Sequence, residues 1–390
     1  MRFFSRKYIF SYLYKLLCKK QIAASYSLSW EQRKFGEIGS VSMCRRIFKE
    51  QTSETGDIPF YKIGTFGAEP DAFISRELFE EYKSKYPYPK KGDILISASG
   101  SIGRTVEFAG NNEYFQDSNI VWLSHDERLS NSFLKCFYSV VKWAGIEGST
   151  IKRLYNDNIL NTVICMPSVP EQEHIGLFFE NLDNLITLHQ RKYDKLTNVK
   201  KSMLEKMFPK NGSNVPEIRF KGFTEAWEQR KFSELYEKVS RKNDLTYGKD
   251  DIISVANMYF KEDSYITDES YLLTYNIFEL GDIAFEGNKS KNYAHGRFVE
   301  NTIGNGIVSH VFDVFKPIMK PYDLQFWKYA INNEQLMGGI LLRSTKASTM
   351  MTNLVANDFL QETFLTPTYP EQQKIGAFFQ QLDNLITLHQ

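Results

Sequence analysis

Cysteine is scarce in this chain of 390 residues, which contains only four. None of the four stands in a C-x-x-C pair, and no group of histidines lies near them in the sequence. A zinc site or a disulfide framework needs clustered or regularly spaced ligands and thiols, so the sequence argues against both. We therefore expect no metal site, and a reducing compartment, the cytoplasm, fits the pattern.

The chain also lacks an excess of charge and a long apolar run. Its net charge is +1, so any binding of nucleic acid must depend on local rather than overall positive charge. Residues 1–26 mix aromatic and basic side chains, and Lys15 interrupts their apolar run. This interruption argues against a signal peptide and against a membrane span. We expect residues 1–26 to be a divergent basic leader ahead of the first domain.

Catalytic motifs are missing as well. The sequence contains no G-x-x-x-x-G-K-[ST], no G-x-S-x-G and no H-E-x-x-H. None of the 12 prolines is adjacent to another, so the Asn/Asp-Pro-Pro-aromatic signature of amino-methyltransferases is absent. The run from Gly100 to Gly103 indicates an ordinary hairpin turn rather than a phosphate loop. We predict that the chain is not an enzyme.

Two phrases of the sequence occur twice. Trp30-Glu31-Gln32-Arg33-Lys34-Phe35 returns at residues 227–232, and the phrase at residues 170–190 returns, with few changes, at residues 370–390. Between the copies the sequence diverges almost completely. A constant frame that carries two different inserts indicates a protein that performs one task twice, on two different targets.

The longer phrase predicts a helix in each copy. Ser168 with Glu171, and Thr368 with Glu371, fit capping boxes, in which hydroxyl and carboxylate bind the first free amides of a helix. Apolar residues then recur every seven positions, which is typical of a long packed helix or a coiled coil.

The first helix should reach Met207 and be on the order of 55 Å long. We expect it to protrude and to pair with the second helix, which ends about halfway, at Gln390, and can cover only part of it. The residues predicted to pair the helices or to dock partner subunits are Ile175, Phe178, Phe179, Leu182, Leu185, Ile186, His189, Leu196, Ile375, Phe378, Phe379, Leu382, Leu385 and Ile386.

The inserts follow a similar order of strands and one aromatic helix, and Gly-Asp-Ile occurs in both. We predict an α+β fold with a pseudo-twofold internal repeat, in which two similar globular domains are joined by long antiparallel coiled-coil helices. The predicted segments are the leader at residues 1–26, a first domain at 27–166, a central long helix at 167–209, a linker at 210–226, a second domain at 227–366 and a truncated second helix at 367–390.

Basic and amide side chains gather in turn-like places of both inserts. Such side chains on loops suit phosphate clamping and groove readout of DNA, although loops are polar in any case. The DNA-binding residues that we predict are Arg104, Lys152, Arg153, Tyr155, Lys289, Lys291, Asn292, Arg297, Arg343 and Lys346.

The doubled phrases resemble the DNA specificity subunit of type I restriction–modification systems. Trp-Glu-Gln-Arg-Lys-Phe opens each half, and Pro-Glu-Gln-x-x-Ile-Gly-x-Phe-Phe-x-x-Leu-Asp-Asn-Leu-Ile-Thr-Leu-His-Gln closes each insert. Residues 216–224 also resemble the opening of a half-subunit in that family. The resemblance covers residues 30–390, nearly the whole chain.

This resemblance implies that each insert is a target recognition domain for one half of a split double-stranded DNA sequence. The repeated helices would pack antiparallel and act as a ruler between the two domains. The implied partners are two modification subunits, which carry S-adenosylmethionine and methylate adenine, and restriction subunits that need ATP and Mg²⁺. No cofactor is expected in this chain, whose role would be non-catalytic.

Two departures from the family pattern leave alternatives open. The leader has no counterpart of residues 216–224, and the second helix lacks the equivalent of residues 191–207. A truncated or defective form that reads one half-site is therefore possible on this sequence, as is a non-DNA helical scaffold protein. Methylation by a co-expressed modification subunit separates the three: a split motif, half a motif or no motif.

Overall fold

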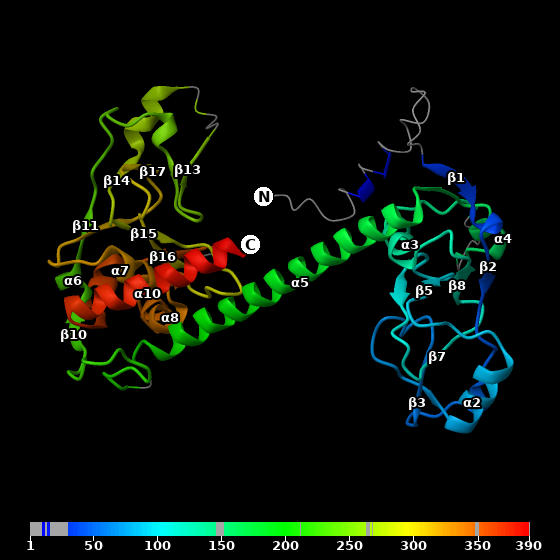
Figure 1. Ribbon diagram of the computed structural model, residues 1–390. Coiled ribbons are helices and arrows are strands. Elements are labelled where there is room, and N and C mark those ends of the chain that lie inside the picture. The colour runs from blue at the N-terminus through cyan, green and yellow to red at the C-terminus, as the bar shows by residue number, and fades with distance from the viewer. Residues whose placement is uncertain are drawn as a thin grey trace. The chain divides into compact units, whose positions relative to one another are not determined.

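The computed structural model describes residues 10–11, 14–15, 30–145, 152–210, 212–262, 266, 268–347 and 351–389. The chain divides into two compact units, Met1–Leu188 (unit 1) and His189–Gln390 (unit 2). Helix α5 (Val169–Lys206) begins in the first unit and ends in the second (Figure 1). In the described part of the chain, no helix is both long and apolar enough to cross a membrane.

Unit 1 is an α+β domain followed by the first part of α5. Its strands are β1 (Glu31–Lys34), β2 (Gly39–Ser42), β3 (Ile58–Tyr61), β4 (Phe73–Ile74), β5 (Ile94–Ser97), β6 (Thr105–Glu107), β7 (Tyr114–Phe115), β8 (Ile120–His125) and β9 (Val163–Met166). Its helices are α2 (Arg76–Lys85), α3 (Asn131–Tyr138) and α4 (Asn156–Leu160), with 3₁₀ turns η2 (Phe35–Glu37) and η3 (Lys49–Gln51).

Unit 2 repeats this plan with more strands. They are β10 (Glu228–Lys231), β11 (Tyr236–Val239), β12 (Ile253–Ser254), β13 (Tyr259–Phe260), β14 (Asn276–Phe278), β15 (Ile283–Glu286), β16 (Arg297–Glu300), β17 (Gly306–Val308), β18 (Val314–Pro317), β19 (Thr345–Ala347), β20 (Thr352–Leu354) and β21 (Thr363–Thr366). The helices are α6 (Phe232–Leu235), α7 (Leu324–Ile331), α8 (Glu334–Ser344), α9 (Ala356–Gln361) and α10 (Tyr369–Leu388), with 3₁₀ turns η4 (Lys249–Asp251) and η5 (Glu269–Thr274).

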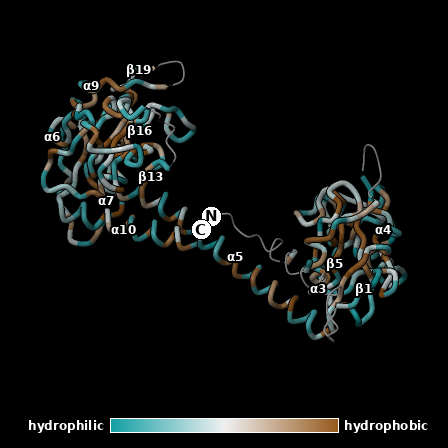
Figure 2. Tube along the Cα trace, turned by 90° about the horizontal axis from the view of Figure 1, so that it is seen from above, coloured by the Kyte–Doolittle hydropathy of each residue, from teal (hydrophilic) through white to brown (hydrophobic). Residues whose placement is uncertain are grey.

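The central antiparallel sheets of the units have the same strand order, β2-β8-β5-β6 in unit 1 and β11-β18-β15-β16 in unit 2. The buried strands of each sheet are nearly continuous apolar runs, such as Ile94-Leu95-Ile96 of β5. Hydrophobic segments accordingly gather inside each unit, around β5 in one and β16 in the other (Figure 2). The remaining small sheets differ, with β4-β3-β7 in unit 1 and β12-β13, β14-β17 and β19-β20 in unit 2.

The repeated phrases close each insert into a domain. The first phrase forms β1 or β10, which pairs antiparallel with β9 or β21, the strand just before the repeated helix. Glu31 pairs with Met166, and Glu228 pairs with Thr366. In each domain, these strand pairs thus join two segments that are far apart in the sequence, and the divergent insert lies between them in the chain.

The helix predicted from the second phrase is present in both copies, but the capping box predicted for the second copy is wrong. Thr368 makes no side-chain hydrogen bond as the N-cap of α10. Glu371 instead binds Arg219 with both carboxylate oxygens, at 2.6 and 2.7 Å, and Glu171 accepts a hydrogen bond from the Trp30 indole at 3.1 Å. These glutamates fix the helix to its domain, a tertiary contact that outweighs the local one.

The apolar stripe of each helix also packs differently from the prediction. In α5, Phe179 is buried in the core of unit 1, with Ile175 and Leu182 packed against it. In α10, the equivalent residues Ile375, Phe379 and Leu382 are buried in the core of unit 2, with Phe378 packed beside them. The other stripe residues are more open: Phe178, Leu185, Ile186 and Leu385 are 43–58% exposed, and Ile386 is half-buried. Much of the predicted helix–helix seam is therefore a helix–domain contact.

Pairing between the two helices does occur within unit 2. His189 of α5 lies beside His389, just past the end of α10, with 2.9 Å between their Nδ1 atoms. Further along, Lys200 of α5 forms an ion pair with Asp383 of α10, and the Tyr329 hydroxyl of α7 donates to the same carboxylate at 2.6 Å. Residue numbers rise along one helix as they fall along the other, so this pairing is antiparallel. Leu196 of α5 packs against the hydrophobic core of unit 2.

The leader is not separate from the first domain, contrary to the prediction. Phe10 is 2% exposed and lies in the core of unit 1, and Tyr14 packs beside it. The Tyr14 hydroxyl accepts a hydrogen bond from the backbone N–H of Cys165 in β9 at 2.8 Å. The domain therefore includes residues before position 27, while residues 1–9, 12–13 and 16–29 lie outside the described residues.

Candidate nucleic-acid interface

In unit 1 the loop between β5 and β6 is a tight turn organised by Ser97. The Arg104 N–H donates to the Ser97 hydroxyl, and the Gly103 N–H donates to the Ser97 carbonyl, both at 2.9 Å. Gly100 and Gly103 adopt φ values of 64° and 83°, which side-chain-bearing residues rarely tolerate. The turn presents Arg104 at the surface, where its guanidinium donates to the Phe66 carbonyl at 2.8 Å.

The segment before α4 lies against this turn. Ser99 and Arg153 form a β-bridge, and the Leu154 N–H donates to the Ala98 carbonyl at 2.8 Å. Arg153 and its neighbours Lys152 and Tyr155 are exposed. The four DNA-binding residues predicted in the first insert therefore belong to one pair of adjoining loops.

The loop between β15 and β16 occupies the same place in unit 2. Asn288 bridges to Met351, and the Thr352 N–H donates to the Gly287 carbonyl at 2.8 Å. This pair of contacts repeats the arrangement of Ser99 with Arg153 in unit 1. Exposed side chains with hydrogen-bond donors stand on the loop and on the neighbouring strand β19: Lys289, Lys291, Asn292 and Lys346.

Two of the predicted DNA-binding arginines already have partners in the protein. Arg297 pairs with Glu286 at 2.7 Å and donates to the Ala256 carbonyl at 2.7 Å. Burial would lower the pKa of Arg297, but the hydrogen bond and charge of Glu286 raise it above its ordinary value. Arg343 binds Glu362 through two nitrogens, at 2.8 and 2.5 Å. Both arginines therefore have contacts within the domain that the sequence did not predict.

Sequence reasoning missed the residues that shape the first loop pair. Asn119 accepts a hydrogen bond from the Ser99 hydroxyl at 2.7 Å, and a Cβ on Gly103 would lie 2.9 Å from the Trp143 indole nitrogen. Asn119 is part of no motif, and Trp143 follows an ordinary buried helix. The local sequence around either residue therefore does not predict its contact with the loop. Their contribution is visible only once residues 97–103 are brought next to them.

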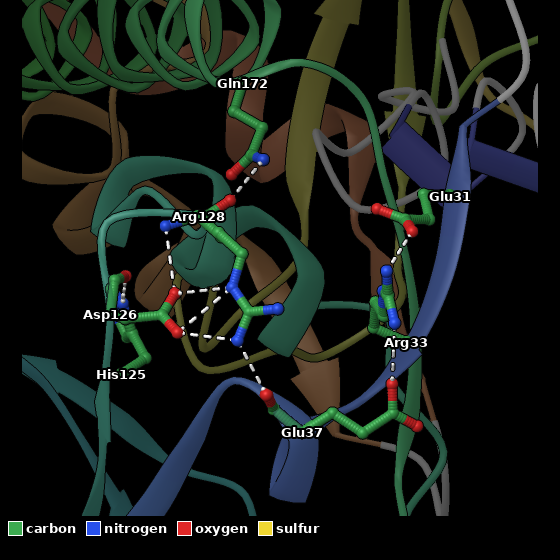
Figure 3. A network of polar contacts seen from close by, with 7 residues as sticks. All are labelled: Glu31, Arg33, Glu37, His125, Asp126, Arg128 and Gln172. Carbon is green, nitrogen blue, oxygen red and sulfur yellow. Dashed lines mark hydrogen bonds and ion pairs between the residues drawn. The ribbon is translucent and has the colours of Figure 1, made fainter.

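A polar network fixes the domain to the start of α5 (Figure 3). The Gln172 side-chain amide donates to the Arg128 carbonyl at 2.9 Å and to the Pro167 carbonyl at 3.0 Å. Arg128 in turn binds Asp126 and the Glu37 carbonyl, and it lowers the pKa of the Asp126 carboxyl through hydrogen bonds. In unit 2 the equivalent Gln372 donates to the Pro367 carbonyl at 3.0 Å. The same glutamine thus ties each helix to its own domain.

The described residues of these loop pairs present cationic and amide donors. Such donors can clamp phosphates and read base edges in a groove. Within the described residues, no three His, Cys, Asp or Glu side chains are grouped so that they could hold a metal ion.

Comparison with known proteins finds a family resemblance in the first half of the chain. Residues 28–198 match the family described as the type I restriction modification DNA specificity domain. A protein of Haemophilus influenzae, provisionally named as a type I restriction enzyme specificity subunit, is 61% identical over 156 residues, or 39% of this chain and 40% of that protein. The chain thus matches less than half the length of this relative. Residues 28–198 thus resemble the DNA specificity domain of type I restriction–modification systems.

More distant relatives cover more of the chain. A type I restriction enzyme specificity subunit of Methanocaldococcus jannaschii is 24% identical over 330 residues, or 76% of this chain and 71% of that protein. The crystal structure of a type I restriction–modification S subunit from M. genitalium covers 94% of this chain and 92% of its own, with a TM-score of 0.49 and 15% identity.

Proposed function

We propose that this chain is a non-catalytic subunit that recognises a bipartite double-stranded DNA sequence, one half with each unit. The observation that carries this proposal is the duplicated architecture, in which two sheets of one strand order support different loop pairs at equivalent positions. A shared scaffold with divergent cationic loops suits two readers of different short sequences.

The physical advantage of two readers lies in specificity. A few base contacts supply roughly 1–3 kcal/mol of discrimination each, which is too little for one small domain to select a site in a genome. When two readers are linked, the second encounter becomes intramolecular and the two selectivities multiply. Partner modification subunits would then methylate adenine at the selected site, and restriction subunits would cleave unmodified DNA.

The proposal is tested by mapping methylated adenines in cells that co-express this chain with a modification subunit. We expect one split motif. Replacing residues 40–161 with the insert of another specificity subunit should change one half of the motif and leave the other half unchanged. Loss of all methylation by a folded, assembled exchange variant, or a motif with only one half in the parent, would contradict the proposal.

Point variants refine this test within one loop pair. Exchanging Lys289 and Lys291 for alanine should weaken DNA binding in a salt-dependent way, because each lost phosphate contact reduces the salt slope by about 1. Arg343→Ala is the matched control, because Arg343 is paired with Glu362. Equal effects of the two changes on the salt dependence of DNA binding would argue against the β15–β16 loop as a phosphate contact.

A further inference from the structure

Phe208, two residues past the end of α5, fills an aromatic socket in unit 2. Phe208 is 2% exposed, and its ring centroid lies 5.9 Å from Trp227, 5.8 Å from Phe326 and 6.3 Å from Phe379. Trp227 comes from the first repeated phrase, Phe379 comes from the second, and Phe326 belongs to α7. We call these three residues the socket of unit 2.

Unit 1 has a socket of the same composition, formed by Trp30, Phe133 of α3 and Phe179. The Trp30 and Phe133 rings meet edge to face at 5.8 Å, as the Trp227 and Phe326 rings do at 6.1 Å. The socket of unit 1 is filled by Phe10, whose ring lies 6.2 Å from Phe133 and 5.2 Å from Phe179. A residue of the leader therefore stands where the end of a long helix stands in unit 2.

Tyr14 closes the remaining side of the first socket. Its ring lies 5.8 Å from Trp30 and 5.6 Å from Phe10, and its hydroxyl binds the Cys165 N–H. Such edge-to-face and stacked aromatic contacts add to the free energy gained from burial alone. Phe10 and Tyr14 are thus held by the same kinds of contact that hold Phe208, although their local sequence is unrelated to that around Phe208.

We propose that the socket of unit 1 is a docking site for the aromatic end of a helix, and that Phe10 and Tyr14 form an intramolecular plug that occupies it. The partner that fits is an amphipathic helix ending in Met-Phe-Pro, the sequence that fills the equivalent socket of unit 2. Met207 and Phe208 are 3% and 2% exposed there, which shows how completely such an end is received. While the plug is in place, the socket is closed to a helix offered by another chain. This proposal does not depend on DNA recognition.

The test is a titration of the full chain with a fluorescent peptide of the sequence at residues 199–210. The intact chain should bind it weakly, because both sockets are filled. The double variant Phe10→Ala/Tyr14→Ala should bind it at least about tenfold more tightly, since the central aromatic anchor of an interface usually dominates affinity. A peptide with alanine in place of Phe208 should lose this gain.

Two neighbouring residues of α5 provide a matched control. Phe179→Ala in the double variant removes a wall of the socket and should abolish peptide binding. Phe178→Ala changes a side chain that is 58% exposed and should leave binding intact. A folded double variant that binds neither peptide, or binds both peptides equally, overturns the proposal.

The outcome is decided even when the double variant folds poorly. Its melting temperature should then rise with peptide concentration, because a ligand that binds the folded state stabilises it by mass action. The peptide with alanine at position 208 should cause no rise. Absence of stabilisation by the parent peptide at saturating concentration would show that the socket does not receive a helix end.

Discussion

The two units hold the same helix glutamate in different ways. In unit 1 the Trp30 indole donates one hydrogen bond to Glu171 at 3.1 Å. In unit 2 the equivalent Glu371 is fully buried and carries a bidentate pair with Arg219, a residue of the segment before the repeated phrase. Identical motif residues therefore do not guarantee identical contacts, because the segment that precedes the repeated phrase supplies the partner of the glutamate in unit 2.

The largest effect should come from breaking the ion pair in unit 2. Arg219→Ala leaves the Glu371 carboxylate buried without its partner, which should lower the free energy of unfolding by about 3–5 kcal/mol. In unit 1, Glu171→Ala removes the acceptor of the single hydrogen bond from the Trp30 indole and leaves the ring in place, which should cost about 1 kcal/mol. Urea denaturation measures both.

Arg230→Ala serves as the control for this comparison. Arg230 pairs with Glu228 at the surface, where both side chains are more than a third exposed, so its loss should change stability by less than about 1 kcal/mol. If Arg219→Ala and Arg230→Ala cost the same, the distinction between a buried and an exposed partner for the helix glutamate is wrong.

The second comparison concerns a glycine that both helices place against a neighbouring helix. A Cβ on Gly376 would lie 2.7 Å from the backbone nitrogen of Phe326, whereas a Cβ on Gly176 would lie 2.1 Å from the Ser132 hydroxyl. Overpacking of this kind typically costs 1–3 kcal/mol, so alanine at either position should lower stability by about that amount.

Removing the clashing side chain should restore stability to different extents in the two units. Ser132→Gly should recover a good part of the stability lost by Gly176→Ala, because the obstructing atoms are mostly in a side chain. Asp323→Gly should recover little for Gly376→Ala, because the Phe326 backbone remains in place. A double-mutant cycle for each pair measures the coupling, and equal recovery in both units would contradict the prediction.

The same repeats show how far sequence reasoning reaches. The long helices follow from the periodicity of the second phrase, and Val169–Lys206 agrees closely with the predicted end at Met207. The partners of those helices do not follow, because Phe179 and Phe379 pack into domain cores that are formed by inserts with no periodic signal. A seven-residue repeat states which face is apolar and not what covers it.

For the candidate site, sequence reasoning found the loops but not the state of their side chains. Arg104 and Lys289 are exposed, as expected of loop cations. Arg297 and Arg343 looked the same in the sequence, but their partners Glu286 and Glu362 become neighbours only after folding. The leader was misjudged for a similar reason, because the aromatic socket that receives Phe10 is built from segments far away in the chain.

The third prediction tests the antiparallel helix pair of unit 2. Asp383→Asn removes the charge that holds Lys200 and weakens the hydrogen bond from Tyr329. Because the Lys200 and Asp383 side chains are 25% and 28% exposed, we expect a loss of about 1 kcal/mol. Lys200→Met should cost a similar amount and Lys201→Met, at an exposed neighbouring position, almost nothing. A cost for Lys201→Met as large as that for Lys200→Met would place the contact elsewhere.

The smallest effect should be the pH dependence of the contact between His189 and His389. Burial lowers the pKa of His389 below its ordinary value of 6.5, and the charges of Lys192 and His189 act in the same direction. The folded state then binds fewer protons than the unfolded state, so stability is present above pH 6.5 and is lost as the pH falls through the lowered pKa. The two rings, 2.9 Å apart at Nδ1, can share one proton but repel each other when both are charged.

The free energy of unfolding, measured at pH 7.5 and 5.5, should therefore show a small loss on acidification that His389→Asn removes. His174→Gln, at an exposed position elsewhere on α5, should keep that loss, and a loss unchanged in His389→Asn would assign it to another group.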